Sequence, residues 1–181
     1  ENNLWIRNIH FFLNKNIIVS DKGILVDFDK KINFYDSFGN EINIKSSCKL
    51  NEKEVILGSI QGLIKFNVYT EKYELLNFPE ERILNLKRIN DTSFYFSAND
   101  GLFIYNIITH KYKLIISNNL FKNDKIQYFE TTTSPDFWVN TYKGNLFLIR
   151  NKKIKKENEA EAKGGLLLLC EGSEKGKTWV D

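Results

Sequence analysis

Short runs of β-branched and aromatic residues alternate with brief polar turns along this chain, and the same pattern occurs four times. In each occurrence a tight turn that ends in glycine joins two apolar runs. The turn glycines are Gly23, Gly62, Gly101 and Gly144, which are separated by 39, 39 and 43 residues. Units of about forty residues with several short strands each are typical of propeller blades. The pattern therefore predicts an all-β chain of β-propeller repeats.

Each unit contains enough residues for four strands. Glycine lets the chain adopt positive φ in the central turn without a Cβ clash, as a tight hairpin requires. The run that follows the second apolar strand is shorter and rich in lysine, which is typical of an edge strand that resists pairing with other chains. The units therefore predict four-stranded antiparallel meanders, with the innermost strand first (residues 4–13, 47–50, 83–89 and 126–131) and the edge strand last (residues 31–35, 72–76, 111–115 and 152–156).

The composition changes after the fourth unit. Residues 157–163 form a charged connection, either a short helix or an extended segment, because Lys153 and Glu157 stand at i,i+4 spacing. Residues 164–181 are expected to form a partial fifth repeat with a turn at Gly176, or strands that close a small ring by pairing with residues 3–9. The four full repeats within residues 1–156 are expected at about residues 1–40, 41–80, 81–120 and 121–156.

The number of repeats leaves two architectures open. A propeller ring closes with roughly four to eight blades, so four repeats and a partial fifth could form a small ring or belong to a larger one. The chain starts with glutamate rather than methionine, and its last repeat is incomplete. Both observations favour a fragment of a larger propeller.

Composition and charge narrow the class of protein. The chain is 42% hydrophobic and 27% charged, as in globular proteins, and has no apolar stretch of the roughly 18–20 residues that a membrane span needs. The net charge is +3. A nucleic-acid surface would gather lysine and arginine beside stacking aromatic residues, whereas lysines here fall mostly in predicted turns and edge strands. A nucleic-acid partner is therefore not expected.

Two of the repeats resemble a known family. Residues 56–67 and 94–106 show a hydrophobic strand, a small polar pair, a Gly-Leu turn and an aromatic strand that ends in asparagine. This pattern resembles the two-component regulator propeller repeat, and the resemblance covers about residues 1–156. It implies the ligand-sensing ectodomain of a bacterial hybrid histidine kinase, periplasmic or extracellular, whose ligand is often a glycan. The alternative is a cytoplasmic propeller that acts as a scaffold for protein–protein interactions.

A second resemblance lies at residues 172–179. This segment is similar to the Asp-box of sialidases, although Glu174 stands at the Asp position and Gly172 at the Ser position. It implies a third alternative, a fragment of a sialidase-like glycoside hydrolase.

Groups that could carry catalysis are scattered. His10 and His110 lie in different repeats, as do Cys48 and Cys170, whose pairing the sequence leaves open. No metal-ligand spacing, phosphate loop or nucleophile motif occurs, so we expect no catalytic, metal or cofactor residues. The carboxylate pairs that a glycosidase could use as acid and base are Asp27/Asp29, Glu52/Glu54 and Glu80/Glu81.

The sequence therefore predicts a non-catalytic binding module for a small ligand, such as a glycan, or for another protein. Loops on a rigid scaffold are the usual place for recognition. We expect binding at the loops that join one blade to the next, which lie at about residues 38–46, 78–82, 118–125 and 157–164.

Overall fold

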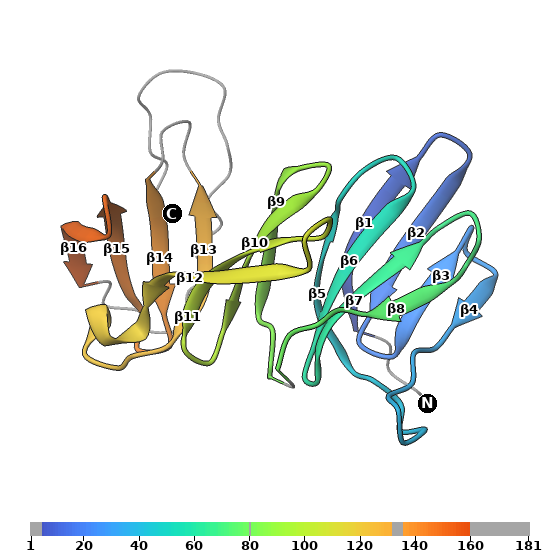
Figure 1. Cartoon of the computed structure of the whole chain (residues 1–181), viewed down its shortest axis with the longest axis horizontal. Coiled ribbons are helices and arrows are strands. Elements are labelled where there is room, and N and C mark those ends of the chain that lie inside the picture. Colours follow the sequence, from blue (N-terminus) through green and yellow to red (C-terminus); the bar gives the residue numbers. More distant parts are fainter. Residues whose placement is uncertain (1–4, 80, 132–135, 160–181) are drawn as a thin grey trace.

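The computed structural model describes residues 5–79, 81–131 and 136–159 and contains four separate antiparallel sheets of four strands each (Figure 1). Every sheet is a meander in which sequence neighbours pair. The all-β prediction and the four-stranded meanders are confirmed. The strands are β1 Ile6–Phe12, β2 Lys15–Ser20, β3 Gly23–Val26 and β4 Lys30–Ile32; β5 Ile44–Lys49, β6 Glu54–Ser59, β7 Gly62–Asn67 and β8 Tyr73–Leu75; β9 Asn85–Asn90, β10 Ser93–Ala98, β11 Gly101–Asn106 and β12 Lys111–Ser117; β13 Ile126–Thr131, β14 Phe137–Thr141, β15 Asn145–Arg150 and β16 Lys153–Glu159, with a 3-10 helix η1 at Asn118–Phe121.

The four sheets follow one another in sequence order, and the first strand of each is the innermost. Strand β1 lies against β5, β5 lies against β9, and β9 and β10 lie against β13. The first and fourth sheets stand at opposite ends of the array in Figure 1. The described residues thus form an open row of four blades.

A hydrophobic core fills each space between neighbouring blades. Leu57 and Ile64 of the second blade face the first blade, and the paired Phe96 and Phe103 of the third blade face the second. The central strands are buried on both sides, because successive side chains of a strand point to opposite faces of the sheet. This double burial explains the nearly continuous apolar runs in the sequence, which a sheet with one wet face would interrupt.

One face of the first blade is only partly covered, since Ile18 on it is buried while Ile9 and Phe11 are exposed. Ile9, Ile18 and Leu25 form a row across β1, β2 and β3 that corresponds to the row of the second blade that contains Leu57 and Ile64. No described sheet packs on this side, and Ile9 and Phe11 are 43% and 67% exposed.

Two expectations about edge strands need correction. Strands β12 and β16 have seven residues each, so these edges are not shorter than the central strands. Strand β16 also continues to Glu159, so residues 157–159 are extended, which is one of the two alternatives expected for this segment, and they belong to the fourth sheet. Pairing with β15 determines that this segment is a strand, because a sequence of alternating lysine and glutamate is compatible with either a strand or a helix. The partial fifth repeat, Gly176 and the Asp-box-like segment lie outside the described residues.

The turn glycines do not all occupy the same position. Gly23, Gly62 and Gly101 are the first residues of β3, β7 and β11, and each follows a turn of two residues. Gly144 instead lies inside a longer turn, because β15 begins at Asn145. Because each glycine stands three residues after the end of the preceding strand, the longer spacing before Gly144 arises between the end of β10 and the end of β14. Among the described residues, no helix is long and apolar enough to cross a membrane.

Candidate functional site

The meander topology separates the connections into two groups. The segments that join one blade to the next lie at the same end as the β2–β3 turn and its equivalents, and we call this the loop end. The β1–β2 and β3–β4 turns and their equivalents lie at the opposite end, which we call the turn end. This arrangement follows from the strand directions, since every blade begins with its innermost strand leaving the loop end.

Backbone hydrogen bonds tie neighbouring blades together at the loop end. The N–H of Ile44, the first residue of β5, donates to the carbonyl oxygen of Asp21 in the first blade at 3.0 Å. The N–H of Ile83 donates in the same way to Ser59 at 2.8 Å, and that of Asn118 donates to Asp100 at 3.0 Å. The entries to the second and third blades are therefore fixed to the turn of the blade before them, whereas the bond of Asn118 joins the end of the third blade to its own turn.

A small hydroxyl residue closes two of the loop-end turns. The hydroxyl of Ser59 donates to the carbonyl oxygen of Gly62 at 2.9 Å and accepts from the N–H of Gln61 at 3.0 Å. Ser20 makes the same two contacts around Gly23, whereas Ala98 holds this position in the third blade. This role of serine in closing the turn was not predicted, although a serine stands three residues before glycine in the first two repeats.

Bulges at the loop end redirect one residue of the innermost strand in three blades. The pairing register of β1 shifts between Ile6 and Asn8, and β5 and β13 shift at the corresponding places. The extra residues are Arg7, Lys45 and Gln127. Bulges of this kind leave one residue unpaired in the ladder and re-aim its side chain.

The bulges bring positive charges together. Burial lowers the pKa of Lys45 below its ordinary value, and the charges of Arg7 and Arg82 lower it further, while Asp21 acts in the opposite direction. Arg7 and Lys45 come from neighbouring innermost strands, and Arg82 precedes β9. Sequence analysis expected lysines mainly in turns and edge strands, but innermost strands also carry cationic residues.

A shallow pocket of about 270 Å³ extends this region to the fourth blade. Arg82 and Lys125 lie in its wall together with the aromatic ring of Tyr142 and the amide of Asn99. A larger hollow of about 490 Å³ lies along the edge strand β12, where most lining residues are aliphatic. The loop-end pocket is the better candidate site, because two cations and two uncharged polar groups converge there.

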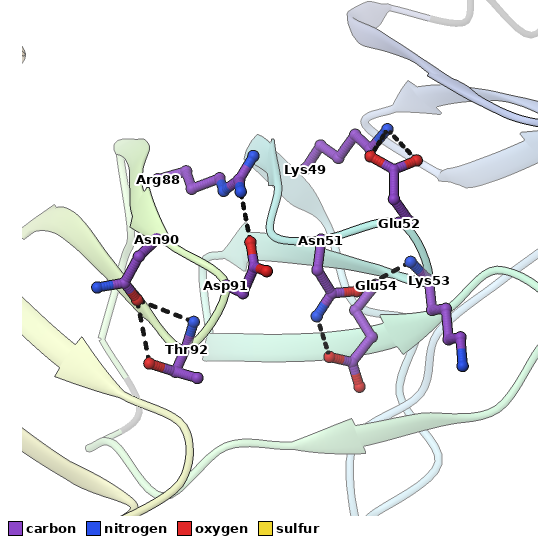
Figure 2. A network of polar contacts seen from close by, with 9 residues as sticks. All are labelled: Lys49, Asn51, Glu52, Lys53, Glu54, Arg88, Asn90, Asp91 and Thr92. Carbon is purple, nitrogen blue, oxygen red and sulfur yellow. Dashed lines mark hydrogen bonds and ion pairs between the residues drawn. The ribbon is translucent and has the colours of Figure 1, made fainter.

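The turn end is built differently, because its charged side chains bind one another. Figure 2 shows the turns β5–β6 and β9–β10, where Lys49 pairs with Glu52 and Arg88 pairs with Asp91. Asn51 also donates to Glu54 at 2.8 Å. These contacts close each turn on itself. By contrast, Arg7, Lys45, Arg82 and Lys125 form no salt bridge within the described parts of the chain.

The two histidines have different surroundings. His10 is buried between the first two blades, where its Nε2 and the Ser47 hydroxyl are 2.8 Å apart. Burial, and to a smaller extent the charge of Lys49, lower the pKa of His10 to about 4. His110 is exposed and occupies a left-handed position in the turn before β12. The structure does not bring these two residues together, since they belong to the first and third blades.

The remaining candidates are also separate. Cys48 is buried, and burial raises the pKa of its thiol to about 12; Cys170 lies outside the described residues. Asp27 and Asp29 lie in the β3–β4 turn, Glu52 and Glu54 at the β5–β6 turn, and Glu81 near the start of the third blade, while Glu80 is not described. No group of three or more histidine, cysteine or acidic residues in the described ranges could hold a metal ion.

Comparison with known structures identifies the fold as that of β-propeller blades. No protein-family model matches the chain, and no curated protein matches its sequence. Similar solved structures include the extracellular domain of the putative hybrid two component system BT3049 from B. thetaiotaomicron (TM-score 0.65, 16% identity, 87% of this chain and 23% of that chain). The extracellular domain of the putative one component system BT4673 from the same organism is comparable (TM-score 0.64, 15% identity, 84% and 22%).

Propellers from other contexts are also similar. The WD40 β-propeller domain of Doa1 superposes with a TM-score of 0.59 at 12% identity, over 85% of this chain and 53% of that one. At these identities the likeness shows the fold alone. The chain spans 22% and 23% of the two bacterial ectodomain chains above, so it corresponds to only a few blades of each.

Proposed function

We propose that this chain is a non-catalytic propeller module that recognises a small ligand as part of the sensing ectodomain of a bacterial two-component regulator. The observation that carries the proposal is the loop end, where residues of the third and fourth blades line a pocket with two cations and two uncharged polar residues. The likeness of the fold to extracellular domains of putative two component and one component systems supports the sensor context. The proposal includes a periplasmic or extracellular location for this chain.

The chemistry of the described residues is consistent with binding. Tyr142 offers a ring face and a hydroxyl at the pocket wall, and Asn99 offers both a donor and an acceptor. Sugars and other polyhydroxylated ligands are recognised by such combinations of aromatic and amide groups. A glycan is therefore the first ligand class to test.

A second function, a scaffold for another protein, is favoured by a different observation. Trp5, Phe11 and Leu13 are 66%, 67% and 87% exposed on or beside the innermost strand of the first blade. Large aromatic side chains are enriched in the core of protein interfaces. This surface is distinct from the loop-end pocket, so the two functions are separable by mutation.

The test is a thermal-shift screen of the whole 181-residue chain against neutral and charged mono- and oligosaccharides. A ligand at 100 times its Kd stabilises the folded state by about 2.7 kcal/mol, which raises the melting temperature by about 5 °C or more for a chain of this size. Each ligand that gives a shift is then titrated by calorimetry against two variants. Tyr142→Ala removes the pocket ring, and Tyr69→Ala removes a partly exposed tyrosine from the turn after β7, at the turn end.

We expect Tyr142→Ala to abolish the shift and Tyr69→Ala to leave it unchanged. If both variants bind as the natural sequence does, the pocket is not the ligand site. If no sugar gives a shift, the sensing proposal for this region fails and the scaffold function becomes the better account.

A further inference from the structure

The cationic residues of the loop end share a structural origin that extends the pocket. Arg7 and Lys45 are the bulged residues of adjacent innermost strands, so the same local distortion presents both side chains at corresponding places in the first two blades. Arg82 lies at the entry to the third blade and also lines the pocket with Lys125. The positive side chains therefore follow the innermost strands across all four blades.

Among the described residues, no ion pair joins these charges to an acid. Seven other cations of the described chain, among them Lys49, Lys87 and Arg150, each contact a carboxylate. Within the described residues Arg7, Lys45 and Arg82 contact none, although the charges of Arg7 and Arg82 act on Lys45. Asp21 is the acid that acts on Lys45, and its carboxylate already accepts the N–H of Trp5 at 3.1 Å.

Buried polar atoms close to Lys45 in the sequence also lack a hydrogen-bond partner within the described residues. The side-chain oxygens of Asn43 and Ser46, on either side of Lys45 in the sequence, are inaccessible to solvent and accept or donate no hydrogen bond within the described chain. The side-chain oxygen of Gln61, in the turn bonded to Asn43, is in the same situation. The side-chain oxygens of Asn33, Glu81, Ser97 and Tyr105 are in the same situation, and each such atom is unusual because buried polar atoms in folded proteins almost always have a partner.

A region that keeps like charges together at a cost in stability is typical of a binding site, because structural side chains relieve such repulsion by pairing. We propose that the loop end binds a ligand that carries an anionic group, a carboxylate, sulfate or phosphate, held by Arg7, Lys45 and Arg82. Tyr142 and Asn99 contact the uncharged part of the ligand in the adjacent pocket. This inference rests on the proposed function and adds a requirement for negative charge.

The experiment compares charged and neutral members of matched pairs by isothermal titration calorimetry with the whole chain. The pairs are glucuronate against glucose, glucose 6-phosphate against glucose, and a sulfated against an unsulfated monosaccharide. Inorganic phosphate and sulfate are titrated separately, which distinguishes a site for the free anion from one for an anionic sugar. We expect a charged member to bind at least about tenfold more tightly than its neutral partner, as a charge-assisted hydrogen bond allows.

Two variants with one charge removed test the location. Lys45→Gln is expected to weaken binding of the charged ligand about tenfold, because it removes the central cation of the cluster. Lys113→Gln removes an exposed lysine from the edge strand β12 and is expected to leave the affinity unchanged. Raising NaCl from 0.05 to 0.5 M should weaken the charged ligand alone. Urea unfolding of both variants shows whether the fold is retained.

Three results overturn the inference. One is equal affinity for charged and neutral members of every pair. Another is equal loss with Lys45→Gln and Lys113→Gln, which would indicate net charge rather than a site. The third is no binding of any charged probe. If neutral sugars bind, and bind more weakly to the Tyr142→Ala variant, the proposed function stands but the requirement for negative charge fails. If no probe binds, the result counts against both the proposed function and the requirement for negative charge.

Discussion

Gly101 occupies a position that no other residue should tolerate, and replacing it by alanine gives the sharpest test of the blade geometry. Gly101 begins β11 with a φ of 147°, and a Cβ built there would lie 2.0 Å from the carbonyl oxygen of Ile116 on the adjacent strand β12. The contact is with backbone, which cannot rotate away as a flexible side chain would. Alanine must therefore separate β11 from β12 at the loop end.

The magnitude has two parts. A non-glycine residue in this region of φ costs about 1–3 kcal/mol. Separating the strands also weakens the pairing of Gly101 with Ser117, at about 1 kcal/mol for each backbone hydrogen bond that is lost. Alanine recovers about 0.4–1 kcal/mol by restricting the unfolded chain. If two backbone hydrogen bonds are lost, we expect Gly101→Ala to reduce the free energy of unfolding by about 2–4 kcal/mol.

Gly62→Ala provides a matched control. Gly62 has a φ of 116° and the same place at the start of β7, but its nearest neighbour to a new Cβ is the carbonyl oxygen of Pro79 at 3.7 Å. This substitution carries the backbone strain without the clash, so we expect a loss of about 1–2 kcal/mol.

Urea unfolding followed by far-UV circular dichroism measures both losses. A difference of about 2 kcal/mol between the variants corresponds to a separation of about 1 M between their unfolding midpoints. Equal midpoints would refute the reasoning, because the approach of Ile116 would then have no energetic consequence. A stabilised Gly101→Ala would refute it as well.

Three further outcomes are expected, each measured by urea unfolding. Ser59→Ala should lower the free energy of unfolding by about 1 kcal/mol, because it removes two hydrogen bonds. Ser97→Ala should be neutral or slightly stabilising, because the buried Ser97 hydroxyl has no partner within the described chain. Equal losses in the two variants would contradict this expectation. The free energy of unfolding of the natural protein should fall by up to about 2 kcal/mol between pH 7 and pH 5. In the unfolded chain His10 binds a proton near its ordinary pKa of 6.5, whereas in the folded protein it does so only near a pKa of about 4, and His10→Gln should therefore lack this loss. An ion pair between Lys87 and Glu130 joins the innermost strands of the third and fourth blades. A double-mutant cycle to alanine should therefore give a coupling free energy of about 1 kcal/mol that falls with added salt. A coupling of zero would show that the pair contributes nothing to stability.

Much of the fold was predictable from local pattern. The glycine turns and the two apolar runs beside them are signals within ten residues, and they located β2 with β3, β6 with β7, and β10 with β11 closely. The repeat near forty residues then indicated blades, since each unit must bury both faces of its central strands against its neighbours. The length of β12 and the end of β16 were not predictable, because pairing with the preceding strand decides how far a polar edge strand extends.

The candidate site was less visible in the sequence. The predicted blade-joining segments include Lys45, Arg82 and Lys125, yet nothing in the sequence indicated that these side chains share one surface with Arg7. Sequence alone cannot locate the bulges either, because a register shift depends on how two strands pair rather than on the residues of one strand. The serine of the loop-end turns can be recognised in the sequence, since it precedes glycine by three residues in the first two repeats. Only the hydrogen bonds of the structure show that it closes the turn.

The sequence by itself determined the class of structure and the four-stranded antiparallel units. These features depend on local alternation of apolar and polar residues and on turn chemistry, both of which act over a few positions. Only the tertiary structure decided which cations gather at the loop end and which are paired in the turns of Figure 2. That distinction depends on distances between blades, which are set when the packed sheets bring residues about forty positions apart into contact.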